Sequence, residues 1–306
     1  MRIGVDVGGT KLEIVAIDGN GAAVLRRRVP TPRGSYEGTL EAIRSLVADA
    51  ETQVGRSTVG IGMPGAISPA TGLVKNANST WLIGRPFGAD LSTVLAREVR
   101  LANDANCLAL SEAADGAAAG RSPVFGVILG TGVGGGLAID GRIVVGANAV
   151  GGEWGHNPMP WPTPAEWPGP ACYCGKTGCI ETLLSGPGLE RDYAQAAGGR
   201  LSALEISAAA TGGESLALET LRRYEDRLAR ALTVVVNIVD PEVIVVGGGV
   251  SNIDHIYEAV PRLWKSFVFS DRVETQLVRA KHGDSSGVRG AAWLWPEKQE
   301  RAGSEE

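Results

Sequence analysis

Long apolar runs and an excess of basic charge are both missing from this 306-residue sequence. No stretch approaches the roughly 20 apolar residues of a membrane span, and Met1 leads directly into a strand-like segment rather than a secretory leader. The formal net charge is −5, whereas duplex binding needs a basic surface that displaces counterions. We therefore expect a cytoplasmic protein that has no membrane and no nucleic-acid partner.

Two common nucleotide-binding motifs are also absent. Residues 4–11 have the glycine spacing of a P-loop but end in Gly-Thr-Lys, where that motif requires Gly-Lys followed by Ser or Thr. Gly130, Gly132 and Gly135 match the dinucleotide fingerprint, but a hairpin with an Asp-Gly turn follows them instead of the required helix. A P-loop enzyme and a Rossmann dehydrogenase are therefore excluded.

The remaining composition is that of a globular protein, with 44% hydrophobic and 21% charged residues. The length suffices for two domains with cores of their own. A strand-turn-strand pattern at the N-terminus restarts at Val124, which indicates a duplicated organisation. The sequence pattern predicts helices over residues 39–51, 90–97, 104–119, 216–239 and 287–295.

Glycine is abundant where strand-like segments end. Because glycine has no Cβ, it adopts positive φ and lets backbone N–H groups approach an anion closely. Three such turns predict that one nucleotide is bound from several sides, and they therefore indicate a phosphate-handling enzyme. The turns are Gly8-Gly9-Thr10-Lys11, Gly130-Thr131-Gly132 and Gly247-Gly248-Gly249.

Cysteine is scarce, but Cys172, Cys174 and Cys179 crowd into eight residues. A disulfide framework fits a cytosolic chain poorly, and three thiolates on a glycine-rich turn favour structural zinc with His156 as the fourth ligand. The alternative is three reduced, buried thiols. The proline-rich residues 157–171 then form a stiff loop whose two ends are held together by the metal, or a polyproline ligand for a partner.

Carboxylates near these turns supply candidate chemistry. Asp104 begins a predicted helix, where it acts as an N-cap or, kept ionised by the helix N-terminus, as a general base. Both roles are compatible. Glu153 and Glu181 flank the cysteine cluster and suit a polyhydroxylated ligand, although each alone is typical of a solvated surface acid.

Several of these motifs together resemble the ROK kinases (repressor, open reading frame, kinase) of the actin-like ATPase superfamily, over nearly the whole chain. Two further segments, residues 74–81 and 281–293, are similar to the bacterial fructokinase, or mannofructokinase, branch. The family motifs are Asp6-Val7-Gly8-Gly9-Thr10-Lys11, Gly60-Ile61-Gly62-Met63-Pro64-Gly65, Asn103-Asp104-Ala105-Asn106, Gly152-Glu153-Trp154-Gly155-His156 and Cys-x-Cys-Gly-x-x-Gly-Cys-x-Glu.

This resemblance implies an α/β protein with the two-domain actin-like ATPase (ribonuclease H-like) fold and an interdomain cleft. The implied N-terminal domain comprises residues 1–119 plus 288–306, with the last helix returning to it. The implied larger domain comprises residues 120–287 and carries the zinc-binding loop. The family likeness also implies a homodimer.

The resemblance further implies a role for each candidate residue. Asp104 takes the proton from the sugar hydroxyl that attacks the γ-phosphate of ATP, and Asp6 meets Mg²⁺ directly or through water. His156 has one ring nitrogen on zinc and the other toward the sugar, which makes the zinc structural. The sugar is held by Gly65, Asn78, Asn103, Asp104, Glu153, His156 and Glu181. The ATP phosphates are lined by Gly8, Gly9, Thr10, Lys11, Gly130, Thr131 and Gly132, and the adenosine lies by Gly247, Gly248 and Gly249.

Fructose, at its 6-hydroxyl, is the substrate that the sequence favours. Glucose, mannose and an N-acetylated hexose remain alternatives, since a few hydrogen bonds decide among hexoses. A sugar-responsive repressor needs a DNA-binding segment ahead of the first phosphate turn, which we do not find here. A non-catalytic sugar-binding regulator is the last alternative, disfavoured because Asp104 and the phosphate turns are present.

Overall fold

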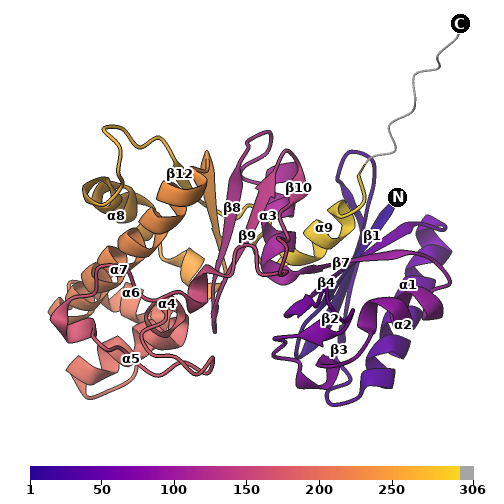
Figure 1. Cartoon of the computed structure of the whole chain (residues 1–306), viewed down its shortest axis with the longest axis horizontal. Coiled ribbons are helices and arrows are strands. Elements are labelled where there is room, and N and C mark those ends of the chain that lie inside the picture. Colours follow the sequence, from indigo (N-terminus) through magenta and orange to yellow (C-terminus); the bar gives the residue numbers. More distant parts are fainter. Residues whose placement is uncertain (297–306) are drawn as a thin grey trace, which may run out of the picture. The chain divides into compact units, whose positions relative to one another are not determined.

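The computed structural model describes residues 1–296 and divides them into two compact units. The first unit comprises residues 1–107 and the returning segment from Gly287, and the second comprises residues 108–286. Each unit contains one five-stranded mixed sheet with helices packed on it, so both are α/β as expected (Figure 1). The domain boundaries expected from the sequence stay a prediction, and their part at 297–306 lies outside the described residues.

The sheet of the first unit has the strand order β3-β2-β1-β4-β7. Strand β1 pairs antiparallel with β2 and parallel with β4, which in turn is parallel to β7. The elements are β1 (Arg2–Val7), β2 (Lys11–Ile17), β3 (Ala23–Pro30), α1 (Tyr36–Val54), β4 (Thr58–Met63), β5 (Ala66–Ile67), β6 (Val74–Lys75), α2 (Phe87–Val94), β7 (Val99–Asn103) and α9 (Ser286–Trp293).

Alternation along β1 explains how both faces of this sheet are covered. Ile3, Val5 and Val7 belong to the core that contains buried residues of α1 and α2, whereas Gly4 faces α9. A Cβ on Gly4 would lie 2.0 Å from the carbonyl oxygen of Val288, so only glycine lets the helix backbone lie directly on the strand. The same face carries Asp6, two residues further along β1.

The second unit repeats this architecture with the strand order β10-β9-β8-β11-β12. Strand β8 pairs antiparallel with β9 and parallel with β11. The elements are α3 (Asp104–Ala114), which enters from the first unit, β8 (Val124–Leu129), β9 (Val133–Ile139), β10 (Arg142–Ile143), α4 (Ile180–Leu184), α5 (Gly186–Ala197), α6 (Ala203–Thr211), α7 (Ser215–Val239), β11 (Val243–Gly247), α8 (Ile256–Leu263) and β12 (Gln276–Arg279).

Again the alternating faces of a central strand pack on different layers. Phe125, Val127 and Leu129 of β8 join the large core that includes α4 to α8, and Val124 joins a smaller core with Ala109 of α3. Figure 1 shows α7 and α3 on opposite sides of this sheet. Among residues 1–296, no helix combines the length and the apolar character that crossing a bilayer requires.

Two predicted helices end earlier than the sequence pattern indicated. Helix α3 stops at Ala114 rather than near Ala119, because the buried Glu112 carboxylate accepts the N–H of Ala117 at 2.7 Å and redirects the chain. Helix α2 stops at Val94 instead of Arg97, since Ala96 has a φ of +49°. Helices α4, α5, α6 and α8 were not predicted.

Candidate functional site

The first glycine turn joins β1 to β2 and is held by three hydrogen bonds. The N–H of Gly8 donates to the carbonyl of Lys11 at 3.0 Å, and Thr31 donates from its hydroxyl to Gly8 and from its N–H to Thr10. Thr10 at the tip is exposed. The turn is therefore fixed from the side of β3 while its tip stays accessible, as a phosphate-binding turn requires.

Asp6, near the end of β1, is a half-buried carboxyl in an unfavourable setting. Burial first, and then the negative charges of Asp104 and Glu13, raise the pKa of Asp6 to about 7. Space beside the carboxyl is kept open by Gly62, where an added Cβ would lie 3.5 Å from Asp6 Oδ1. A hard cation prefers oxygen ligands, and its positive charge would offset both the burial of the carboxyl and the neighbouring negative charges. The chemistry of this donor set therefore fits Mg²⁺.

Asp104 follows β7 as the first residue of α3, and Asn103 therefore precedes the helix. The N–H of Ala105 is 2.9 Å from Asn103 Oδ1 and 2.8 Å from Asp104 Oδ1. Asn103 thus shares the capping role that the sequence analysis gave to Asp104 alone. The same Asn103 side chain donates to the carbonyl of Gly65 at 3.1 Å. The neighbour of the candidate base therefore contacts a residue that is predicted to bind the sugar.

Gly65 occupies a position that excludes side chains. Its φ is +74°, and a Cβ would lie 2.3 Å from the carbonyl oxygen of Lys75. This close approach comes from the small hairpin of β5 and β6, which brings residues 75–77 beside Gly65. Asn78 follows that segment and is exposed. The first unit therefore gathers Gly65, Asn103 and Asp104, with Asn78 nearby along the chain.

In the second unit, the second and third glycine turns lie together. Gly248 has a φ of +84° and packs against Leu129, the residue before Gly130, with room for no Cβ. Glu181 of α4 lies at the second turn, because its Oε2 accepts the N–H of Val133 at 2.9 Å. A Cβ on Gly132 would lie 2.7 Å from that same oxygen. Two predicted phosphate turns and one predicted sugar ligand are thus neighbours.

The Glu153–His156 motif is a short 3₁₀ turn lying on β9. Trp154 anchors it, with the ring N–H donating to the carbonyl of Gly134 at 2.9 Å. Gly155 packs on the backbone of Val133, where a Cβ would lie 2.4 Å from the carbonyl oxygen. The buried tryptophan and the missing side chains of β9 place His156 in a half-buried position and leave Glu153 exposed.

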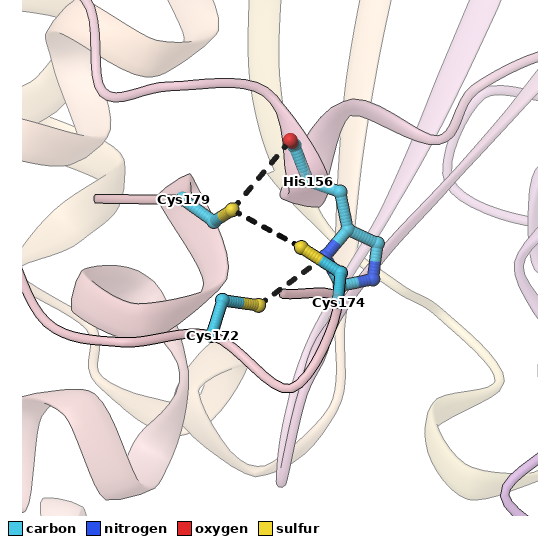
Figure 2. Close-up of side chains that lie close together, drawn as sticks. All are labelled: His156, Cys172, Cys174 and Cys179. Carbon is cyan, nitrogen blue, oxygen red and sulfur yellow. Dashed lines mark hydrogen bonds between the residues drawn. The ribbon is translucent and has the colours of Figure 1, made fainter. Parts of the chain in front are cut away.

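His156, Cys172, Cys174 and Cys179 form a compact donor set, with all ligand atoms within 4.8 Å of one another (Figure 2). His156 Nδ1 is 3.6 Å from Cys172 Sγ, and the sulfurs of Cys174 and Cys179 are also 3.6 Å apart. A tetrahedral zinc with sulfur at about 2.3 Å and nitrogen at about 2.0 Å separates its ligand atoms by about 3.5–3.8 Å. The four side chains therefore fit zinc in number and type, and these two pairs of ligand atoms also have its spacing.

Local backbone geometry determines the positions of the cysteines. Cys172 and Gly175 close a tight turn, in which the N–H of Gly175 donates to the carbonyl of Cys172 at 3.0 Å and Gly175 takes a φ of +87°. Burial, and then the neighbouring thiols of Cys174 and Cys172, raise the pKa of Cys179 to about 12. A bound cation offsets both effects, because it favours the thiolate.

The proline-rich residues 157–171 are fixed to α7 by buried charges. Glu166 accepts from Arg227 Nε at 2.7 Å and from Arg230 Nη2 at 2.9 Å. Arg230 also donates to the carbonyl of Trp161 at 2.9 Å. All three charged side chains are at most 10% exposed. The excursion that leads into Cys172 is therefore anchored through Glu166.

We expect the variant Glu166→Gln to lose about 1–3 kcal/mol of unfolding free energy, because two buried guanidinium groups lose the carboxylate that they share and keep only Asp192 and Asp226 as acidic partners. Burial alone raises the pKa of Glu166, but hydrogen bonds from Arg230, Arg227 and the N–H of Thr163 outweigh it and lower the pKa to about 2. Stability from this carboxylate is present above the unfolded pKa of about 4.3 and is lost as pH falls toward 2. Urea unfolding at pH 7 and pH 3 measures both effects.

The exposed pair Glu258–Arg262 on α8 supplies the control, since Glu258→Gln removes an ion pair whose side chains are 72% and 76% exposed. A change of at most about 0.5 kcal/mol is expected there. Equal, small changes in both variants would show that Glu166 does not anchor the excursion.

Two side chains that the sequence analysis did not single out join these groups. Glu13 lies opposite Asp6 in the register of β1 and β2, and it accepts from Arg26 and Arg28 at 2.6 Å each. Tyr173 contacts His156, with its hydroxyl 3.0 Å from Nε2. Because side chains alternate along β2, the sequence places Glu13 on the same face of the strand as Lys11. That Glu13 lies beside Asp6 follows only from the register in which β1 and β2 pair. Tyr173 could have been identified from its position in the sequence between two predicted ligand cysteines.

Comparison with known proteins identifies relatives along nearly the full chain. A model of the ROK family matches residues 2–298. An N-acetyl-D-glucosamine kinase from Pectobacterium atrosepticum is 42% identical over 299 residues, which cover 96% of this chain and 98% of that protein. The crystal structure of a ROK hexokinase from Thermus thermophilus superposes with a TM-score of 0.84 at 31% identity, covering 96% of this chain and 97% of that one. A ROK family glucokinase from Streptomyces griseus, in complex with glucose and AMPPNP, gives a TM-score of 0.76 at 28% identity, with 96% and 98% covered.

Proposed function

This chain belongs to the ROK family, and we propose that it is an ATP-dependent kinase of N-acetyl-D-glucosamine. The observation that carries the substrate assignment is 42% identity to an N-acetyl-D-glucosamine kinase over 96% of the chain. The sequence analysis favoured fructose on residues 74–81 and 281–293 and kept an N-acetylated hexose as an alternative. The comparison supports that alternative better, and fructose becomes the second candidate.

The proposal makes Asp104 the general base. A base must be ionised and must reach the attacking hydroxyl, and Asp104 stands at the start of α3, where the helix dipole favours its negative charge. Asn103 supports it by capping the same helix and by holding Gly65. The proton of the sugar hydroxyl passes to the Asp104 carboxylate as the oxygen attacks the γ-phosphorus, while the bond from that phosphorus to the bridging oxygen breaks and ADP leaves.

Phosphoryl transfer otherwise needs positioning and charge neutralisation. We assign the phosphates to the turns Gly8–Lys11 and Gly130–Gly132, and the adenosine to Gly247–Gly249. Asp6 would hold Mg²⁺, which supplies charge neutralisation at the phosphates when bound. The sugar contacts are assigned to Gly65, Asn78, Asn103, Glu153, His156 and Glu181.

Zinc has a structural role in this proposal. With all four positions taken by His156, Cys172, Cys174 and Cys179, a tetrahedral ion has no open position for substrate. Its bond to Nδ1 would fix the tautomer and the ring orientation of His156, and so aim Nε2 at the sugar. Glu181 follows Cys179 by two residues, so the same metal would also hold the start of α4.

Initial rates with ATP and Mg²⁺ on a panel of hexoses test the substrate assignment. We expect kcat/KM for N-acetyl-D-glucosamine to exceed that for fructose, glucose, mannose and N-acetyl-D-mannosamine by at least about 10²-fold, because a site built to hydrogen-bond one group discriminates strongly against analogues that leave it unpaired. A higher kcat/KM for fructose would restore the first choice of the sequence analysis. Equal values for all five sugars would contradict a dedicated substrate.

A further inference from the structure

Tyr173 lies between two cysteines of the cluster, but its side chain turns back onto the histidine. The residue is 84% exposed, and yet its hydroxyl lies 3.0 Å from His156 Nε2. The two rings meet edge-on, at 89° with centroids 5.1 Å apart. Since Tyr173 sits in the tight turn closed by Cys172 and Gly175, the backbone of the cysteine loop directs the phenol to this position.

The two nitrogens of His156 have different neighbours. Figure 2 shows Nδ1 directed at Cys172, and the other ring nitrogen pointing away from the sulfurs. A metal on Nδ1 leaves the single ring proton on Nε2, which then donates to the Tyr173 hydroxyl. The proposed function assigns this same N–H to the sugar. One N–H has one good acceptor at a time, so the phenol and a sugar hydroxyl compete for it.

We propose that Tyr173 is a gate on the sugar contact of His156: its hydroxyl accepts the Nε2 hydrogen bond in the sugar-free protein, and a sugar hydroxyl replaces it on binding. This inference rests on the proposed function, because it needs a sugar that contacts His156. Tyr173 thereby sets how tightly the protein binds its sugar, and it does so without taking part in the chemistry.

The surroundings of the phenol agree with this placement. Glu181 and Glu153 lie close enough to the phenol to act on it electrostatically. Both carboxylates are among the residues assigned to the sugar, so the Tyr173 hydroxyl lies in the part of the second unit where the sugar contacts are expected.

The gate predicts that deleting the hydrogen bond between Tyr173 and His156 increases the affinity for the sugar. The apparent sugar affinity equals the intrinsic affinity multiplied by the fraction of molecules whose binding group is free, so removing the competitor raises the apparent affinity. For Tyr173→Phe we expect the Kd of N-acetyl-D-glucosamine, measured by calorimetry, to fall by about 2- to 10-fold, the range that one net hydrogen bond represents. Tyr193→Phe is the matched control, because its hydroxyl is directed at Glu214 in the same unit, and its Kd should equal that of the wild type.

A second readout observes the hydrogen bond itself. The ¹⁵N resonance of His156 Nε2 should differ between the sugar-free wild type and sugar-free Tyr173→Phe, and it should coincide once both are saturated with sugar. An unchanged or higher Kd for the variant, or identical sugar-free spectra, would overturn the gate. A wild type that binds no hexose at all would instead overturn the proposed function, so the two failures are distinguishable.

Discussion

Replacing Asp104 with asparagine is expected to lower kcat by at least about 10²-fold, and by as much as about 10⁴-fold, while the Kd of the sugar changes little. An amide has nearly the volume of a carboxylate and can still cap α3 beside Asn103. It cannot accept a proton, however, and so the attacking hydroxyl loses its base. Steady-state rates at saturating sugar and ATP, together with calorimetric binding of the sugar, separate the two effects.

Asp90→Asn is the control for this prediction. Asp90 lies on α2 in the same unit and accepts the Tyr36 hydroxyl at 2.6 Å, so its replacement tests the general effect of losing a carboxylate. Its kcat should stay within about twofold of the wild type. A Asp104→Asn variant with more than a tenth of the wild-type kcat would remove Asp104 from the mechanism, whatever the substrate.

Cys174→Ser is expected to abolish stoichiometric zinc. The wild type should retain about one zinc per chain after dialysis, because a structural four-ligand site binds its metal with an apparent free energy of about 10–16 kcal/mol. Loss of one direct ligand should weaken zinc binding by more than the about 10- to 100-fold that loss of an outer partner costs. Metal analysis of both proteins after dialysis against a mild chelator measures the difference. With His156 no longer fixed, the sugar Kd should rise as well.

Cys174 is a sharper position than Cys172 or Cys179, because it is the least buried of the three and its replacement disturbs packing least. Cys107→Ala controls for the cysteine count, since Cys107 lies in α3 outside the cluster, and this variant should keep its zinc. A wild type without zinc, or a Cys174→Ser protein that keeps a full equivalent, would leave the four side chains as a reduced thiol cluster.

Local sequence signals predicted the elements that place the site. The strands β1, β8 and β11 and the turns after them follow from apolar runs that stop at glycine, and the Asp140-Gly141 turn identified the β9–β10 hairpin. The donor set of His156 with three cysteines could be predicted because ligand type and spacing are themselves local.

Features that depend on tertiary contacts could not be predicted in this way. The early end of α3 follows from Glu112, whose carboxylate also accepts the N–H groups of Lys281 and His282 far along the chain. Likewise, Asn103 holds Gly65, and Arg227 and Arg230 of α7 meet Glu166. The choice among hexoses depends on individual hydrogen bonds of this kind, so the motifs indicate a sugar kinase but do not determine which sugar it uses.

Transfer of labelled phosphate tests the central claim most directly. Zinc-loaded protein is incubated with γ-labelled ATP, Mg²⁺ and N-acetyl-D-glucosamine, and the label is separated into ATP, inorganic phosphate and hexose phosphate. We predict that the label moves into hexose phosphate, in amounts equal to the ADP formed and only when the sugar is present. Label that stays in ATP, or that passes to inorganic phosphate irrespective of the sugar, would contradict the assignment of this chain as an N-acetyl-D-glucosamine kinase.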